Sequence, residues 1–434
     1  MATVSFLRPF GTLVGCWCLL LTAGCTHRGA EADPAAVTEP VATPVTPSET
    51  VRLDDPSLLA GISGDGPLTV AEVSRWLAEP TSLAPLVVEL PAWLAPGAGQ
   101  VKDLSDNPLS RAKIELGRQL FFDKRLSADG SLSCAGCHQP EHGFAYPRPL
   151  ATGAAGEPGR RHPPTLLNRI MLAVGDDRQL WDGSALSVEA ALLHTLADEQ
   201  EMGADPSATI TRLETLEPYR LQFAKLYGGV SWAAIGDAIG GFVRCLVTGD
   251  SPYDRAVQWR TYERLPEDLL AADVELSARF LAAQQAAATQ PLSAAARRGE
   301  RLFFGNRAWC SACHNGVNFT DEQFHNIGIG LDGPDPDLGR FLVTGHDADW
   351  AAFKTPTIRN ALATAPYMHD GSLPTLAAVV DWYAQGGRPN RNLDYRFSWL
   401  EPGSLSPQDK ADLVAFIEAC GGPLPQVETG RLPE

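Results

Sequence analysis

The sequence predicts a mainly α-helical protein built from two similar domains, with long irregular loops and little β-structure. Several segments have helical spacing or composition, whereas the apolar–polar alternation of half-buried strands is scarce. The 434 residues include 40 Gly and 34 Pro, which indicates that much of the chain is turn and loop. One short motif occurs twice with similar flanks, and this duplication predicts the two domains. Helices are expected at residues 110–120, 187–196, 232–247, 267–288, 293–302, 373–383 and 407–419.

The N-terminal 25 residues have the form of a bacterial export signal. Arg8 precedes an apolar run that is too short to span a bilayer comfortably. Small residues before Cys25 resemble a lipoprotein cleavage box, so Cys25 is a candidate for lipidation and for a membrane anchor; ordinary cleavage close by is the alternative. Residues 26–50 are rich in Ala, Thr, Pro and Glu and are typical of a disordered tether. We place this tether within an N-terminal extension spanning residues 26–105.

The charge of the chain excludes one class of partner. The sequence has 35 Lys and Arg against 52 Asp and Glu, which gives a formal net charge of −17. Nucleic acid is therefore not expected as a partner, because phosphate contacts require a basic surface. The nine cysteines are too few for a disulfide scaffold, and an odd number cannot all pair.

Four cysteines form two Cys-x-x-Cys-His motifs, which are typical of c-type haem attachment. Cysteines three residues apart lie on one face of a helical turn, so both can form thioethers with the vinyl groups of one porphyrin. The adjacent His then binds the iron as its proximal ligand. A redox cysteine pair needs no adjacent His, and the motifs are too far apart for a zinc quartet at finger spacing. We predict two covalent haems, on Cys134, Cys137 and His138 and on Cys310, Cys313 and His314.

Similar segments precede the two motifs and share the pattern Gly-x-x-Leu-Phe-Phe, at Gly117–Phe122 and Gly299–Phe304. We predict that each segment places an aromatic wall against its haem. The sequence thus predicts two cytochrome c-like domains with one haem each. We place them at residues 106–285 and 286–425, followed by a tail of residues 426–434.

The motifs, together with the segments between them, resemble the bacterial di-haem cytochrome c peroxidase and MauG family over about residues 106–420. The resemblance implies a periplasmic oxidoreductase that reduces hydrogen peroxide at the N-terminal haem with electrons from the C-terminal haem. A small cytochrome c or a copper protein would be the donor. It also implies calcium between the domains, and family members often form homodimers. The signatures are Leu180–Gly183, Glu201–Gly203, Phe324–Gly328, Lys354–Asn360 and Pro366–Gly371.

The resemblance assigns roles to two residues of the peroxide reaction. Glu201 aligns with the family's distal acid–base, and a carboxylate above an open iron can move a proton between the two peroxide oxygens. An apolar haem pocket would raise the pKa of this carboxyl. Trp181 aligns with the tryptophan between the haems, where an indole can relay an electron. From the residues alone, an exposed Glu at a helix start and a core Trp are the alternatives.

Other aligned positions concern the C-terminal haem and calcium. Tyr383 lies where the family supplies the sixth ligand of this haem: peroxidases carry Met there and MauG carries Tyr. Met368 is the rival ligand, and a haem without a strong sixth ligand is the third alternative. Thr364 and Pro366 align with the residues whose backbone carbonyls bind calcium. The family's third ligand, an Asn, is replaced by His162, and an imidazole is a poor calcium ligand.

Three further features distinguish the chain from the family or stay unassigned. Some members carry a His ligand for the resting N-terminal haem, but residues 148–160 contain no His, so we predict that this haem is open at rest. Ala191 replaces a distal Gln, which predicts weaker positioning of peroxide, or positioning by His194 or water. Cys245 and Cys420 are either buried thiols or, in an oxidising compartment, a disulfide.

The sequence leaves three functions open. The first is reduction of hydrogen peroxide to water. The second is a MauG-like reaction, in which peroxide-generated high-valent haems oxidise a protein or other partner, and Tyr383 and Ala191 favour it. The third is a non-catalytic di-haem electron carrier. Glu201 and the missing distal His argue against a carrier, because a carrier should have both irons capped.

Overall fold

The computed structural model describes residues 48–102, 104–172 and 177–434. The predicted signal peptide, Cys25 and nearly all of the predicted tether therefore lie outside the described residues. The tether is wrong at its C-terminal end, because Glu49 and Thr50 belong to a β-strand. In the part of the chain that the structure describes, no helix combines the length and the apolar character needed to cross a membrane.

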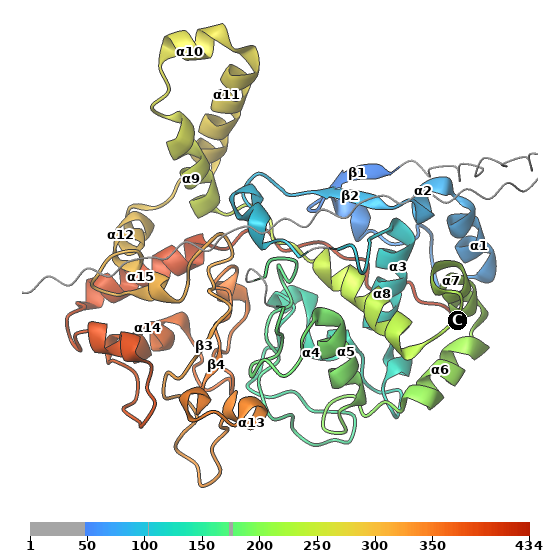
Figure 1. Ribbon diagram of the computed structural model, residues 1–434. Coiled ribbons are helices and arrows are strands. Elements are labelled where there is room, and N and C mark those ends of the chain that lie inside the picture. The colour runs from blue at the N-terminus through green and yellow to red at the C-terminus, as the bar shows by residue number, and fades with distance from the viewer. Residues whose placement is uncertain (1–47, 103, 173–176) are drawn as a thin grey trace, which may run out of the picture. The chain divides into compact units, whose positions relative to one another are not determined.

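Most of the regular structure is helical, as the sequence predicts (Figure 1). Shorter 3-10 segments connect the helices, and among them are η5 (Cys310–Ala312), η7 (Ala361–Ala363) and η8 (Tyr395–Trp399). The α-helices within the described residues are α1 (Val70–Ala78), α2 (Pro80–Leu83), α3 (Arg111–Phe122), α4 (Cys134–Cys137), α5 (Val188–Ala197), α6 (Pro206–Thr215), α7 (Glu217–Tyr227), α8 (Trp232–Arg244), α9 (Pro252–Tyr262), α10 (Glu267–Ala272), α11 (Val274–Thr289), α12 (Ala294–Phe303), α13 (Phe341–Thr344), α14 (Leu376–Ala384) and α15 (Pro407–Ala419).

Side-chain caps fix the starts of the helices that the sequence predicted. Ser110 and Ser293, at the start of α3 and α12, each accept a hydrogen bond from a backbone N–H three residues on. The helix predicted at 267–288 is wrong as a single element. It is divided into α10 and α11 at Asp273, whose side chain caps the start of α11. Helices α1, α2, α6, α7 and α9 were not predicted.

The β-structure is limited to two short pairs of strands in the described residues. β1 (Glu49–Arg52) pairs in parallel with β2 (Leu86–Glu89), with Thr50 opposite Val87. β3 (Phe324–His325) pairs antiparallel with β4 (Phe353–Lys354). The first pair belongs to the N-terminal extension, which is therefore folded rather than a simple linker.

Two similar helix pairs form the frame of the protein, α3 with α8 and α12 with α15. The repeated Gly of the Gly-x-x-Leu-Phe-Phe pattern lies at each crossing. A Cβ on Gly117 would lie 2.0 Å from the backbone oxygen of Ala238, and a Cβ on Gly299 would lie 1.9 Å from that of Asp412. Only glycine allows the backbones to approach this closely.

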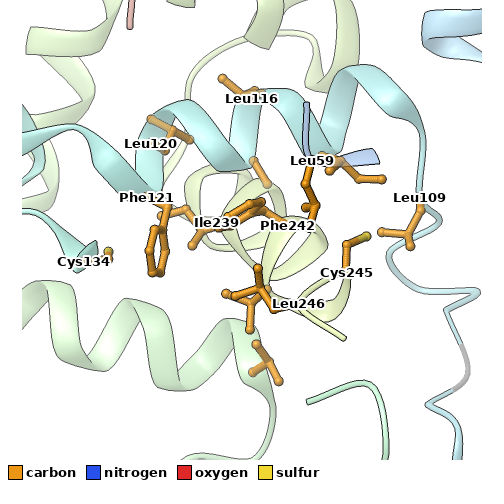
Figure 2. Close-up of a cluster of buried hydrophobic side chains, with 14 of the residues drawn as sticks. Leu59, Leu109, Leu116, Leu120, Phe121, Cys134, Ile239, Phe242, Cys245 and Leu246 are labelled. Carbon is orange, nitrogen blue, oxygen red and sulfur yellow. The ribbon is translucent and has the colours of Figure 1, made fainter. Parts of the chain in front are cut away.

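A separate hydrophobic cluster surrounds each helix pair. In the first, Phe121 of α3 packs against Phe242 of α8 with ring centroids 5.2 Å apart (Figure 2). In the second, Phe303 packs against Phe416 at 5.0 Å. Each Cys-x-x-Cys-His motif thus has a hydrophobic core of its own, as two domains would require. The limits of the two domains stay predictions.

Two further segments complete the fold. Helices α9, α10 and α11 form an arm that extends away from the two helix pairs (Figure 1).

The C-terminal tail folds back onto the extension and α3. The buried guanidinium of Arg118 on α3 donates to the backbone oxygens of Glu428 and Arg431 in the tail. The side chain of Arg431 in turn donates to the backbone oxygen of Ile62 in the extension. The tail thus fastens the extension to the first core.

Candidate functional site

A cavity of about 440 Å³ lies at the N-terminal Cys-x-x-Cys-His motif. We call it the N-terminal cavity. Cys134 and Cys137 are on the one-turn helix α4, and His138 follows directly. Phe121, the first Phe of the repeated pattern, lines the cavity, whereas Phe122 is not among its lining residues. Of the two Phe rings predicted to form an aromatic wall here, Phe121 therefore lines the cavity and Phe122 does not.

His138 is oriented so that one ring nitrogen remains available to a metal. Its Nδ1 lies 3.1 Å from the backbone oxygen of Phe144 and 3.0 Å from that of Pro164, so Nδ1 carries the proton and donates. Burial lowers the pKa of His138 to about 4, so the imidazole is neutral. Nε2 is left as a lone-pair donor, which is the state that a proximal iron ligand requires.

Glu201 lines the N-terminal cavity together with both cysteines and His138. Burial raises the pKa of its carboxyl, and the nearby Asp198 raises it further, whereas Thr195, His194 and Arg160 oppose the shift. The loop that carries it is held by backbone hydrogen bonds, including one of 2.7 Å from Ala154 N to Glu201 O. A carboxyl in this place can accept a proton from a group in the cavity and return it, and it holds its proton up to a higher pH than an ordinary Glu.

Three other predictions concern the lining of the N-terminal cavity. Ala191 lines it, as its alignment with the distal Gln predicts, and so does His194. His162 also lines it, although its Nδ1 is engaged by the backbone oxygens of Arg148 and Pro149. Because two imidazoles besides His138 reach this wall, an open resting state stays a prediction.

The C-terminal motif lines a second cavity of about 220 Å³, which we call the C-terminal cavity. Cys310, Cys313 and His314 contribute to its wall, and Phe303 supplies the aromatic ring that Phe121 supplies in the first cavity. The Nδ1 of His314 lies 3.1 Å from the backbone oxygen of Phe319, which again leaves Nε2 for a metal.

Both rivals for the sixth ligand, Tyr383 and Met368, line the C-terminal cavity. Tyr383 is on α14 and stacks on Phe397 with ring centroids 5.7 Å apart. Burial raises the pKa of its phenol, so the side chain is protonated unless a cation holds it. A phenolate is therefore stable here only when a cation such as iron holds it. The choice between the two ligands stays a prediction.

Trp181 lies in the wall that the two cavities share. Its indole N–H donates to the backbone oxygen of His162 at 2.8 Å, and its own backbone oxygen accepts from Lys354 N of β4 at 2.8 Å. The preceding residue, Leu180, has a φ of +66°, which turns the chain sharply. These contacts hold the indole in the wall that the two cavities share. Its role as an electron relay stays a prediction.

Arg161 joins Asp182, the residue that follows Trp181, to Asp337 in a distant loop, a role that was not predicted from the sequence. Its guanidinium donates to Asp182 at 2.6 Å and to Asp337 at 2.6 Å and 3.0 Å. It also lies over the ring of Phe353. A Trp-Asp pair preceded by an Arg about twenty residues upstream was the only sequence signal available.

The predicted calcium ligands come together, but they do not fit calcium well. Thr364, Pro366 and His162 all line the C-terminal cavity. Two backbone oxygens and an imidazole fall short of the six to eight oxygen ligands that calcium takes. The carboxylates of Asp182 and Asp337 are paired with Arg161 and are not free to supply further oxygens. No step of the proposed reaction is therefore assigned to calcium.

The two cavities do fit covalent haems. Each has a cysteine pair with the spacing of two thioethers, a neutral imidazole with a free Nε2, and a wall formed largely by apolar side chains. Cys245 and Cys420 lie outside this chemistry. Both are buried free thiols in different hydrophobic clusters, so the disulfide alternative is wrong.

Comparison with known proteins finds relatives that are named as di-haem peroxidases and MauG proteins. A family model described as di-haem cytochrome c peroxidase matches residues 111–261. The chain is 34% identical over 330 residues to the methylamine utilization protein MauG of Methylorubrum extorquens, covering 75% of this chain and 83% of that protein. It is 30% identical over 346 residues to the cytochrome c551 peroxidase of Pseudomonas aeruginosa, covering 77% and 86%. A solved structure of a MauG-like protein associated with microbial copper homeostasis aligns with a TM-score of 0.62 and 31% identity, covering 77% and 95%.

Fold and site together define a protein with two c-type haems in cytochrome c-like domains. The chain belongs to the di-haem cytochrome c peroxidase and MauG family, as the sequence resemblance predicted. It is an oxidoreductase of the di-haem peroxidase type.

Proposed function

We propose that the protein reduces hydrogen peroxide to water in the bacterial periplasm. Electrons would come from a small cytochrome c or a copper protein and pass from the C-terminal to the N-terminal haem. The position of Glu201 carries this proposal, because its carboxyl shares the N-terminal cavity with the proximal His138. Peroxide reduction requires a proton carrier at this place.

The protein's contribution to the reaction is mainly control of protons and of electron transfer. The haem in the N-terminal cavity, when bound, supplies the iron at which peroxide binds and is reduced. With the haem in place, the Glu201 carboxylate would accept a proton from one peroxide oxygen and return it to the other, which leaves as water. Trp181, in the wall between the cavities, provides an indole through which electrons can pass. His138 stays neutral and correctly oriented through its two backbone acceptors.

Steady-state consumption of peroxide tests this proposal. With reduced small cytochrome c as donor, we expect wild-type turnover and a loss of at least about 100-fold in kcat for Glu201→Gln. Glu199→Gln is the matched control, because Glu199 is an exposed carboxylate two residues away on the same loop. Haem content is measured in all three proteins. Equal turnover by the Glu201 and Glu199 variants would contradict the assignment.

A MauG-like oxidation of a protein or other partner is the second candidate. Tyr383 in the C-terminal cavity favours it, because the MauG branch of the family carries Tyr at the aligned position. Peroxide added to the oxidised protein without donor distinguishes the two functions. A slowly decaying near-infrared absorption band favours oxidation of a partner, whereas fast turnover with reduced cytochrome c and no such band favours peroxide reduction.

Calcium, the lipid anchor and a homodimer are finer points of the proposal. We expect peroxide turnover to survive prolonged treatment with a calcium chelator, because the aligned residues Thr364, Pro366 and His162 offer only two backbone oxygens and an imidazole. Loss of activity that added calcium restores would contradict this expectation.

Mass spectrometry of the exported protein tests lipidation of Cys25, and sedimentation tests the homodimer.

A further inference from the structure

The wall between the two cavities contains a buried imidazole whose proton is shared by two backbone oxygens. His162 is 3% exposed and lines both cavities. Burial lowers the pKa of its ring, so the imidazole is neutral and carries one proton. Its Nδ1 lies 3.2 Å from the backbone oxygen of Arg148 and 3.1 Å from that of Pro149, so this nitrogen carries the proton. The ring therefore holds two neighbouring carbonyl groups through a single N–H.

The backbone of His162 holds two further segments. Its N–H donates to the backbone oxygen of His369 at 2.7 Å, and its carbonyl oxygen accepts from the indole N–H of Trp181 at 2.8 Å. The segment that follows His369 lies directly against the held carbonyls, because a Cβ on Gly371 would lie 2.8 Å from the backbone oxygen of Pro149. One residue thus joins three segments, and the indole of Trp181 takes its position from that residue.

The preceding residue, Arg161, gathers negative charge from two other segments. Its guanidinium donates to Asp182 at 2.6 Å and to Asp337 at 2.6 Å and 3.0 Å. Against the effect of burial, this cation holds the pKa of both carboxyls below their usual values, so both stay ionised. It also lies over the ring of Phe353, which stacks on His369 with ring centroids 3.5 Å apart. Through His369, the contacts of the two adjacent residues belong to one connected cluster.

A bound divalent cation usually gathers carbonyl and carboxylate oxygens from separate segments of a protein. We propose that Arg161 and His162, which we call the clasp, take the place of such a cation, and that His162 is the positioning residue that fixes the Trp181 indole between the cavities. The side chain of His162 brings no oxygen to a metal, and its N–H occupies the carbonyl oxygens of Arg148 and Pro149. The proposal rests on the proposed function only in the use of Trp181 between the haems; the replacement of a cation does not depend on it.

One substitution should return this wall to a metal-binding form. His162→Asn replaces the imidazole by an amide whose oxygen is a ligand that calcium accepts, beside the carbonyl oxygens that the ring no longer occupies. We therefore expect this variant to depend on calcium where the wild type does not. His346→Asn is the matched control, because His346 is exposed and lines neither cavity.

Thermal unfolding tests the replacement without measuring turnover. Each haem-loaded protein is unfolded once after treatment with a calcium chelator and once with calcium added back, and the wild type and His346→Asn should each have the same Tm in both conditions. In chelator we expect the Tm of His162→Asn to lie at least about 3 °C below that of the wild type, and to rise when calcium is added. Calcium that raises the Tm of the wild type as well, or that leaves His162→Asn unchanged, would overturn the replacement. The wild-type measurement needs no variant, so it can overturn the proposal even where His162→Asn does not fold.

Electron transfer between the haems tests the positioning of Trp181. The half-reduced protein, with its electron on the C-terminal haem, is mixed with hydrogen peroxide, and oxidation of that haem is followed. In chelator we expect this oxidation to slow by about tenfold in His162→Asn, to recover with calcium, and to be unchanged in His346→Asn. The dependence of the rate on peroxide concentration should not change, since Glu201 is left intact. Oxidation in chelator-treated His162→Asn that is as fast as in the wild type would overturn the positioning.

The two measurements separate failure of the clasp from failure of the proposed function. If peroxide does not oxidise the C-terminal haem of the wild type, the proposed route of electrons fails, and thermal unfolding alone decides the clasp. If the wild type transfers its electron but chelator slows this transfer as it does in His162→Asn, the clasp is overturned while the proposed function stands.

Discussion

At the scale of single residues, the surroundings of Glu201 set the pH range in which it can act as a base. Its carboxyl lines a largely apolar cavity, and burial raises its pKa. The carboxylate form must be present to accept a proton from peroxide. Because the pKa is raised, this form is lost at a higher pH than for an ordinary Glu.

The pH profile of peroxide reduction checks this consequence. As the pH falls through the raised pKa of Glu201, the base form disappears, and kcat/KM for peroxide should decline. We expect the midpoint of the decline to lie above the ordinary value of 4.5 for a Glu carboxyl. Asp198 raises the midpoint further and Arg160 lowers it, but the net shift caused by burial stays upward. An identical limb in the residual activity of Glu201→Gln would assign it to another group.

Tyr383 offers a second prediction at the residue scale. We expect Tyr383→Met and Tyr383→Phe to change the electron paramagnetic resonance spectrum of the C-terminal haem. Replacing a phenolate by a thioether should also raise its reduction potential, because Met ligation favours the reduced iron. Met368→Leu is the matched control, since Met368 lines the same cavity. Spectra that change only in the Met368 variant would show that the rival ligand is the right one.

At the scale of secondary-structure elements, the duplicated Gly-x-x-Leu-Phe-Phe pattern has two separate functions. The first Phe of each copy lines a cavity. The Gly lets α3 cross α8, and α12 cross α15, with almost no space between the backbones. The sequence analysis recognised the aromatic wall but not the helix crossing, because a glycine within a helix carries no signal of what lies opposite.

This crossing reverses the usual effect of a Gly to Ala change in a helix. Alanine normally stabilises a helix by about 1 kcal/mol relative to glycine. At Gly117 and Gly299 the added methyl would overlap a backbone oxygen, so we expect a net loss of about 2 kcal/mol in the free energy of unfolding. Gly241→Ala on α8 is the control, because its Cβ would meet only ordinary contacts at 3.4 Å. Urea unfolding measures all three, and stabilisation by Gly117→Ala would contradict the crossing.

At the scale of the whole molecule, much of the site could be predicted from local patterns. The haem motifs, their proximal imidazoles and Glu201 belong to short signatures, and the structure gathers each set around one cavity. Contacts between distant segments could not be predicted. Arg161 joins residues far apart in the chain, and the C-terminal tail returns to the extension through Arg118 and Arg431. The aromatic contact between Trp309 and Trp399 is of the same long-range kind.

The proposed function requires that peroxide reacts in the N-terminal cavity and draws its electrons from the C-terminal haem. The most direct test is the half-reduced protein, in which only the C-terminal haem carries an electron, mixed rapidly with hydrogen peroxide. We predict that oxidation of the C-terminal haem slows by at least about 100-fold in Glu201→Gln, although that residue lines only the other cavity. An unchanged rate in Glu201→Gln would mean that peroxide reacts at the C-terminal haem itself, and would contradict the account.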